Sequence, residues 1–243
     1  MHVKRLTLIG IAAIAAGYTF LSNAGTAFDA PRGTAVVAAP ECGLVPAPES
    51  PGFAGHALRR AEETARFGYQ RVCQADLVRF EVRPELKPLP LVLAGLDFQP
   101  VDLADTPIAR LTSLGGMAEA VGQTRSRLYR SFRMSDGHTL TLLEHDQSAD
   151  GSSGWREPAH ESERINGLPA RLDVLQADAG KAVSVLSWQE GRRAYQMWID
   201  ANVAVENSRE QFLALAAALP RSVPARPALP EAAPVALAPG AAP

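Results

Sequence analysis

Proline limits the part of this chain that can fold to about residues 52–219. Proline has a fixed φ and no backbone N–H, so it interrupts helices and sheets alike. Residues 25–51 and 220–243 combine frequent proline with alanine and show no hydrophobic period, which is typical of linkers and tails. We predict a Pro/Ala-rich linker before the domain and a disordered tail after it. The block between them is long enough to bury a core as a single globular domain.

Alternating hydrophobic runs within this block predict strands, and glycine marks the turns between them. Asp136-Gly137 and Glu190-Gly191 each separate two alternating runs, and glycine supplies the positive φ that a tight turn needs. Further runs, at 76–82 and 170–177, also alternate and are predicted as strands. The sequence therefore predicts a sheet built largely from hairpins.

Helical spacing is found near both ends of the same block. It covers 55–73, where alanines alternate with charged residues, and 207–219, which Pro220 ends. The segment Leu114-Gly115-Gly116 is interpreted as a turn or a helix break. We predict an α+β domain with an antiparallel sheet of about five or six strands and helices at both ends of the domain.

The first hairpin has a predicted register that follows from its turn. A two-residue turn at Asp136-Gly137 places Met134 opposite Thr139. Four apolar side chains then share one face of this hairpin, namely Leu128, Phe132, Met134 and Leu143.

The second hairpin holds two tryptophans and a tyrosine within eighteen residues, "VSVLSWQEGRRAYQMWID". A two-residue turn at Glu190-Gly191 pairs Trp188 with Arg193 and divides the apolar side chains between two faces. We expect the larger face to be core, because large aromatics usually fill a small sheet core. Its residues are Leu186, Trp188, Tyr195, Met197 and Ile199. Trp198 falls on the other face beside Val183 and Val185, and these three are our candidate partner or ligand surface.

The first 24 residues have the pattern of an export signal. A short basic start with Lys4 and Arg5 precedes an uncharged apolar run from Leu6 to Leu21. The run is slightly shorter than the ~20 residues that span a bilayer comfortably, so a cleaved signal peptide and an uncleaved membrane anchor both remain open. In either case the basic start stays in the cytoplasm. We predict an exported, periplasmic protein that is soluble or is anchored in the inner membrane by residues 6–21.

Cys42 and Cys73 are the only cysteines of the chain. An even number of cysteines in an oxidising compartment favours a disulfide, and two unpaired thiols are the alternative. Their separation fits neither a CxxC redox pair nor a zinc site.

The titratable residues form no pattern that indicates an enzyme. The nearest approach to a metal or catalytic cluster lacks the ligand spacing of one helical face. Its members are His138, Glu144, His145, Asp146 and His160. Asp150, Ser152 and His160 supply the residue types of a triad, but no strand-to-helix elbow carries the serine, so we expect no catalytic, cofactor-binding or metal site. The formal net charge of −2 gives no basic surface for nucleic acid.

Four short segments, in order, resemble the extracytoplasmic domain of bacterial membrane-anchored anti-sigma factors. They are "PLPLVLAGLDFQPVDL" from residue 88, the hairpin "DGHTLTLLEHD", the hairpin "VLSWQEGRRAYQMWI" and the terminal helix "EQFLALAAALP". In the second hairpin, Trp188, Gly191 and Tyr195 resemble the family's W-x-x-x-G-x-x-Y pattern, with the glycine one position early. The likeness covers residues 88–219, about half of the chain, by mostly structural motifs.

The resemblance implies a regulatory or accessory role at the cell envelope. Those regulators carry a cytoplasmic helical domain that binds the sigma factor, and only five residues precede Leu6 in this sequence. We therefore expect a non-enzymatic envelope protein that binds another envelope protein and no sigma factor. A periplasmic carrier of an apolar ligand or lipid is the alternative, and an enzyme is least favoured.

Overall fold

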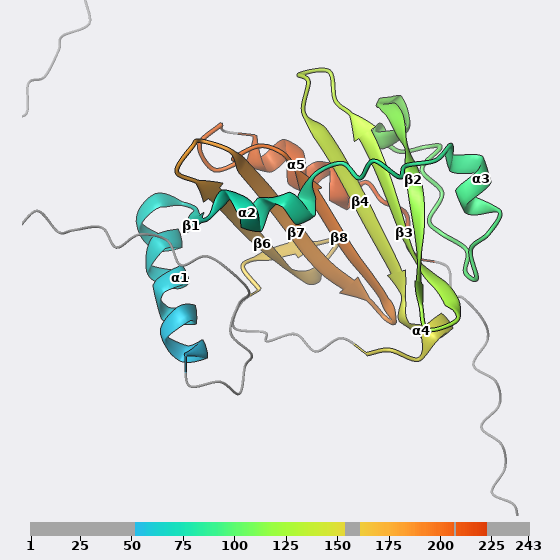
Figure 1. Ribbon diagram of the computed structural model, residues 1–243, viewed down its shortest axis with the longest axis horizontal. Helices are drawn as coiled ribbons and strands as arrows, with labels where there is room; N and C mark the ends of the chain where they lie inside the picture. The colour runs from blue at the N-terminus through green and yellow to red at the C-terminus, as the bar shows by residue number, and fades with distance from the viewer. Residues whose placement is uncertain (1–51, 154–160, 207, 223–243) are drawn as a thin grey trace, which may run out of the picture. The chain divides into compact units, whose positions relative to one another are not determined.

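An eight-stranded mixed sheet forms the centre of the protein (Figure 1). The structure is a computed structural model that describes residues 52–153, 161–206 and 208–222. Strands pair in the order β1-β6-β7-β8-β4-β3-β2, and β5 pairs with β6 beside this path. The strands are β1 (Gln70–Val72), β2 (Thr112–Val121), β3 (Thr124–Arg133), β4 (Thr139–Asp146), β5 (Glu163–Ile165), β6 (Leu168–Ala177), β7 (Ala182–Glu190) and β8 (Arg193–Ile199).

The α+β class agrees with the prediction, but the sheet is larger than five or six strands and is not wholly antiparallel. β1 runs parallel to β6, whereas the other strand pairs are antiparallel. The sequence pattern indicates neither β1 nor β2. β1 is only three residues long, and β2 contains the glycine pair that we interpreted as a break.

The glycine pair in β2 serves a close approach between two backbones. Lys87 and Gly116 exchange two backbone hydrogen bonds of 2.8 Å. Gly115 has a φ of 113°, and a Cβ placed on it would lie 2.6 Å from the Lys87 carbonyl oxygen. Only glycine fits there, so Leu114-Gly115-Gly116 marks an irregularity within a strand rather than a turn.

The loop of the β3–β4 hairpin is one residue longer than the predicted two-residue turn. Arg133 pairs with Thr139, and Gly137 adopts a φ of 91° after a turn closed by its N–H and the Met134 carbonyl oxygen at 3.1 Å. This is a type I turn followed by a left-handed glycine, a common three-residue hairpin loop. The one-residue shift moves Leu143 to the opposite face from Phe132, contrary to the prediction.

The β7–β8 hairpin keeps the predicted faces but not the predicted pairs. Glu190 pairs with Arg193, so the turn is Gly191-Arg192 and Trp188 lies opposite Tyr195. The register therefore differs by two residues from our prediction. A shift of two preserves the face of each side chain, because the side-chain period of a strand is two.

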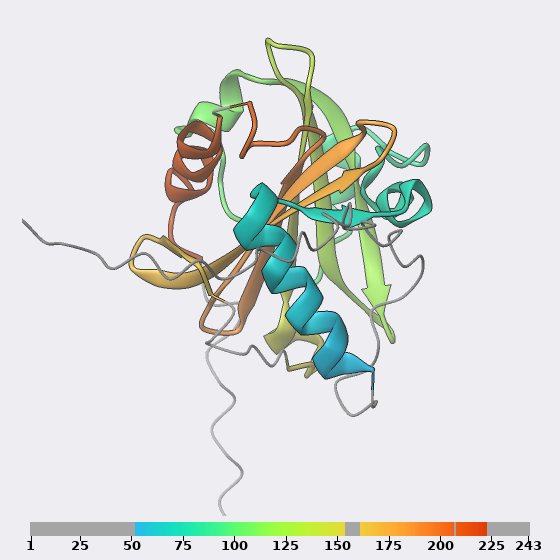
Figure 2. The same cartoon turned by 90° about the vertical axis from the view of Figure 1, so that its left-hand side faces the viewer.

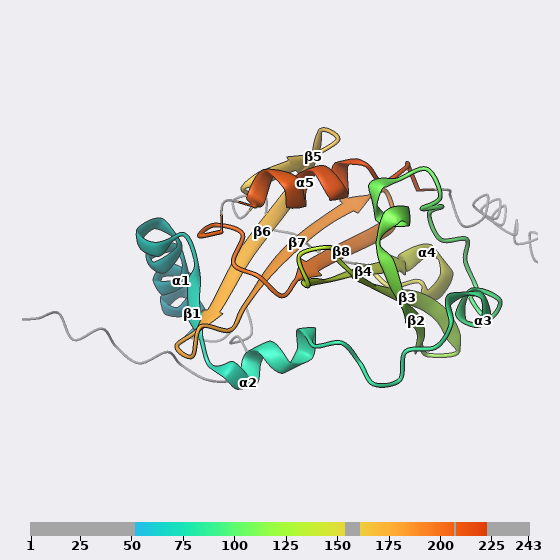
Figure 3. The same cartoon turned by 90° about the horizontal axis from the view of Figure 1, so that it is seen from above.

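The helices frame the sheet. They are α1 (Phe53–Phe67), α2 (Gln74–Leu77), α3 (Leu89–Leu93), α4 (Gln147–Asp150) and α5 (Arg209–Ala217), with short 3-10 turns η1 (Val78–Phe80) and η2 (Pro107–Arg110). α5 and α2 lie on opposite faces of the sheet (Figure 3). α1 ends at Gly68, whose φ is 79°, and lies beside β1 (Figure 2).

Each face of the sheet buries its own apolar cluster. On the α5 face, Phe212 and Leu215 pack with Leu186 and Met197 of the central strands. On the other face, Leu77 and Phe80 pack with side chains of β3, β6, β7 and β8. Two opposed layers therefore cover the sheet, which explains why its central strands are apolar on both sides.

The run 76–82 is helical and not the strand that its alternation predicts. α2 and η1 occupy it, and this places Leu77 and Phe80 three residues apart on one side. Val78 and Val82 point outward and are exposed. Packing onto the sheet therefore outweighs the local preference of a short alternating run.

Within the described parts of the chain, no helix has the length and apolar character needed to cross a membrane. Residues 1–24, where the signal or anchor is predicted, and the linker 25–51 lie outside the described residues.

Candidate binding pocket

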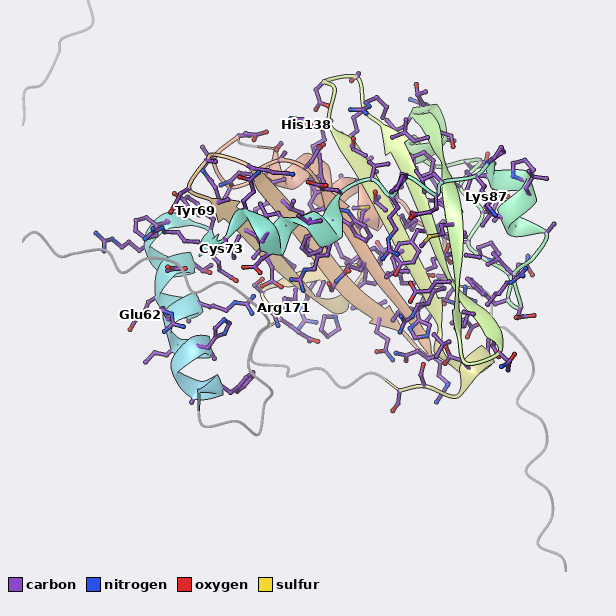
Figure 4. All side chains as sticks on the ribbon, viewed as in Figure 1. Glu62, Tyr69, Cys73, Lys87, His138 and Arg171 are labelled. Atoms are coloured by element: carbon purple, nitrogen blue, oxygen red, sulfur yellow. The ribbon has the colours of Figure 1, made fainter. Side chains whose placement is uncertain are left out.

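The polar residues that the sequence singles out near β4 separate onto different parts of the fold. Glu144 and Asp146 lie on the α5 face, whereas His145 between them lies on the opposite face. His138 is at the tip of the β3–β4 hairpin, with Asp200 at 3.2 Å (Figure 4). His160 lies outside the described residues. Among the residues that are described, no group of His, Cys, Asp and Glu side chains could hold a metal ion.

Glu144 and Asp146 belong to a buried ion network. Glu144 pairs with Arg130 and with Arg193 at 3.2 Å, and Arg193 also reaches Asp146 at 3.2 Å. Burial raises the pKa of Glu144, against the opposing effect of Arg130, and burial lowers the pKa of Arg130. The Glu144 carboxylate also accepts the backbone N–H of Val101 at 3.0 Å. The network therefore ties the loop before η2 to the sheet and is structural.

Asp150 and Ser152 contact His145, which the triad considered in the sequence did not include. The His145 Nε2 atom lies 2.7 Å from the Asp150 carboxylate and 3.2 Å from the Ser152 hydroxyl. Burial raises the pKa of Asp150, but hydrogen bonds from Ser126, Ser152 and His145 outweigh it and hold that pKa well below its ordinary value. A catalytic relay uses both ring nitrogens, with serine on one and the carboxylate on the other. Here one nitrogen meets both groups, so the cluster fixes the turn after β4.

Trp198, Val183 and Val185 do not form an exposed surface, and this corrects our prediction. Their side chains are 6%, 3% and 3% exposed, respectively. Phe80 covers Trp198 edge-on with ring centroids 5.8 Å apart, and the indole N–H donates to the Phe80 carbonyl oxygen at 2.9 Å. The segment that contains α2 and η1 covers the face that we expected to be open.

Cys73 lies between β1 and α2 (Figure 4). It is not a free thiol. Its predicted partner Cys42 lies outside the described residues, so the Cys42–Cys73 disulfide stays a prediction.

A pocket of about 390 Å³ opens on the α5 face, at the hairpin that carries the aromatic residues. The turn between β5 and β6, the ends of β7 and β8 and the chain that follows α5 form its walls. It is lined by Ile165, Asn166, Leu168, Trp188, Glu190, Tyr195, Ala216, Leu219, Pro220 and Arg221.

Two stacked aromatic rings form the apolar side of this pocket. Trp188 and Tyr195 are cross-strand neighbours whose rings lie 5.0 Å apart at an interplanar angle of 11°. Both are 3% exposed, and both belong to the core cluster of the α5 face, as predicted. The same pair is therefore part of the core and part of the pocket lining.

The Tyr195 hydroxyl is buried and makes no hydrogen bond of ordinary geometry with the described residues, although the Ser222 side chain lies close enough to lower the Tyr195 pKa. Burial raises the pKa of Tyr195, and the nearby Glu144 carboxylate raises it further. An unpartnered buried hydroxyl is unfavourable by about 1–3 kcal/mol. Because this oxygen is shielded from solvent, a ligand in the pocket would meet the walls and the rim rather than the hydroxyl.

Backbone groups and charges define the rim of the pocket. The Glu190 carboxylate accepts the Ser222 N–H at 2.8 Å. Asn166, with a φ of 51°, donates from its amide to the Ala217 carbonyl oxygen at 3.0 Å and so satisfies one of the last carbonyls of α5. Arg221 lines the same rim and is exposed.

Sequence reasoning missed this pocket, although it placed the two aromatic residues correctly on the core face. The walls come from segments that are distributed between Ile165 and Arg221, and their meeting depends on how α5 packs on the sheet. The Asn166-Gly167 dipeptide is a turn signal that could have pointed to one wall. Comparison with known proteins adds no relative: no family model, curated protein or solved structure matches this chain.

Proposed function

We propose that this chain is an exported, non-enzymatic envelope protein that binds a segment of another envelope protein in this pocket. The observation that carries the proposal is the pocket beside the stacked Trp188–Tyr195 pair, with apolar walls and the charged side chains of Glu190 and Arg221 in its lining. Large aromatic side chains with one polar atom are the groups that most often anchor binding sites. The role is regulatory or accessory, in keeping with the resemblance to anti-sigma factor domains.

The pocket suits a peptide segment better than a fully apolar molecule. Its walls at Ile165 and Leu168 are apolar, while Glu190 and Arg221 place opposite charges on its rim. A peptide offers apolar side chains for the walls and backbone hydrogen-bonding groups for the charged rim. Its backbone N–H and C=O groups can form hydrogen bonds with the oppositely charged side chains of the rim.

Site-specific photo-crosslinking in native envelopes tests the proposal. p-Benzoylphenylalanine replaces Leu168, a half-buried wall residue, in the full-length chain. The matched control carries the same group at Leu91, which is 71% exposed on α3 and outside the pocket. We expect irradiation to produce one discrete protein adduct from position 168 and none from position 91. No protein adduct at position 168, or identical adducts at both positions, would contradict the proposal.

A carrier of an apolar ligand is the second candidate. The pocket volume lies within the range of roughly 300–1,000 Å³ that is usual for small-molecule sites. In the same experiment a lipid or small-molecule adduct at position 168, without a protein adduct, would favour the carrier.

A further inference from the structure

Helix α1 directs charged residues toward the domain and apolar residues away from it. Arg60 pairs with Asp173 of β6 at 3.3 Å. The Glu63 carboxylate accepts the backbone N–H of Arg71 at 2.9 Å. Within the described chain, no residue of α1 is buried, and Leu58 is 62% exposed. A helix that packs on a domain normally turns its apolar side inward, so the orientation of α1 is reversed.

The outer side of α1 carries four exposed apolar side chains, which we call the α1 face. Successive members are four, three and four residues apart, which is the spacing of the a and d positions of a heptad, so they lie along one side of the helix. α1 lies at one end of the sheet beside β1, where a second molecule can approach it (Figures 1 and 2). The α1 face consists of Ala54, Leu58, Ala61 and Ala65.

The α1 face is complementary to a second copy of itself. Its spacing is the same in both directions along the helix, so a two-fold axis between residues 59 and 60 places the face of one copy against the face of an antiparallel copy. Leu58 then lies opposite Ala61 of the second copy, and Ala54 lies opposite its Ala65. A large side chain packs against a small one at both central contacts, which allows the two helices to interdigitate.

The charges beside the α1 face fit the same antiparallel arrangement. Glu62 is exposed and lies on the side of α1 away from the sheet (Figure 4). Arg59 flanks the same side of the face, about 60° around the helix. Antiparallel packing brings equal flanks together, so Glu62 of one copy lies about 3 Å along the axis from Arg59 of the other. Parallel packing would instead place both charges beside Ala57 and Thr64. Charge complementarity therefore favours a second copy in the antiparallel orientation.

We propose that α1 is the contact of a homodimer, in which the α1 faces of two copies pack antiparallel about a two-fold axis. This inference is independent of the proposed function, because no residue of α1 lines the pocket and both pockets stay open in the dimer. The face covers roughly 16 Å by 10 Å, well below the ~800 Å² per partner of a standard interface. The dimer is therefore weak, with a dissociation constant on the order of 100 µM.

Photo-crosslinking of the full-length chain at about 300 µM, above that dissociation constant, tests the contact. p-Benzoylphenylalanine at position 58 is compared with the same group at Leu91, which is 71% exposed on α3. In a mixture of isotope-labelled and unlabelled chains, position 58 should link to the tryptic peptide 61–66 of the other copy. Position 91 should give at least tenfold less dimer. No dimer from position 58, equal yields from both positions, or a link between two copies of peptide 33–59 overturns the proposal.

A charge exchange tests the orientation without a crosslinker. Glu62→Arg and Arg59→Glu each place like charges opposite one another in the antiparallel dimer, so each variant alone should associate about fivefold more weakly in sedimentation velocity. An equal mixture of the two should regain the wild-type association, because each arginine then lies opposite a glutamate. Unchanged association of either variant alone, or no recovery in a mixture of folded chains, overturns the proposal.

Leu58→Glu completes the test if either charge variant does not fold. It puts a charge at the centre of the α1 face and should leave the chain monomeric up to about 300 µM, whereas Leu91→Glu should associate like the wild type. Equal melting temperatures of the two variants show that the difference lies in association. Dimerisation of Leu58→Glu overturns the proposal.

Discussion

At the scale of single residues, the polar groups on the α5 face divide into satisfied and unsatisfied ones. Glu144 has two arginines and a backbone N–H as partners, whereas the Tyr195 hydroxyl, on the strand next to it, has none. Fully partnered buried charges hold a fold together, and an unpartnered buried donor weakens it. This contrast is the reason for assigning a structural role to Glu144.

Replacing Glu144 with glutamine should destabilise the protein by about 3–5 kcal/mol, because two buried arginines then lose their carboxylate. Denaturant unfolding measures this change. Asp178→Asn is the control, since the Asp178 side chain that pairs with Arg71 at 3.2 Å is 67% exposed and its loss should change the free energy of unfolding by less than about 1 kcal/mol. Equal effects of the two substitutions would contradict the structural role of the buried network.

Replacing Tyr195 with phenylalanine should leave the free energy of unfolding unchanged or raise it by about 1 kcal/mol, because it removes an unpartnered hydroxyl. Tyr129→Phe is the opposite control: its hydroxyl donates to Glu119 at 2.7 Å, so stability should fall by about 1 kcal/mol. A clear loss of stability in Tyr195→Phe would show that the hydroxyl has a partner.

Asp150 makes the stability of the fold depend on pH in the acidic range. Its pKa in the folded state lies below the ordinary value of 3.8, so the ionised carboxylate stabilises the fold above about pH 4. This contribution is lost as the pH falls further. Asp150→Asn should therefore be less stable than the wild type at pH 6, and the difference should narrow between about pH 4 and pH 2. Denaturant titrations at several pH values test this, and a constant difference would contradict it.

At the scale of elements, turn geometry determines which side chains reach the core. The left-handed Gly137 adds one residue to the β3–β4 loop, and Leu143 consequently faces α2 rather than α5. In the β7–β8 hairpin the difference from the predicted turn is two residues, and the faces are retained. A predicted face therefore stays correct when the register is wrong by an even number of residues, and it becomes wrong when the error is an odd number.

Two glycine-to-alanine substitutions should have opposite signs. Gly137→Ala should destabilise the protein by about 1–2 kcal/mol, because a side chain disfavours a φ of 91°. Gly55→Ala, within α1 and with open space around it, should stabilise by about 0.5–1 kcal/mol. Thermal and denaturant unfolding measure both. The same sign for the two would show that φ does not control the β3–β4 turn.

At the scale of the whole molecule, the predicted Cys42–Cys73 bond would tie the linker to the domain. The bond would close a loop of about thirty residues, which is worth up to ~3–4 kcal/mol in the chain-entropy model. Cys73→Ser should therefore lower the melting temperature in oxidising buffer. Reductant should lower the wild-type melting temperature to the same value and leave the variant unchanged. An unchanged melting temperature in the variant would exclude a stabilising bond.

Local patterns were sufficient for the class of the fold and for most of its strands. Alternation and turn signals identified β3, β4, β6, β7 and β8, and helical spacing identified α1 and α5. They also placed Trp188 and Tyr195 on the core face. These features depend on residues that are close in sequence, where periods of two and 3.6 are directly visible.

Long-range packing accounts for the rest. The run 76–82 became helical because Leu77 and Phe80 pack together on the sheet, and this covered Trp198. The glycine pair of β2 joined the sheet because the Lys87 backbone approaches it. The pocket exists because α5 brings Pro220 and Arg221 against the aromatic hairpin. None of these contacts has a local sequence signal, since each depends on surfaces that exist only after the sheet has formed.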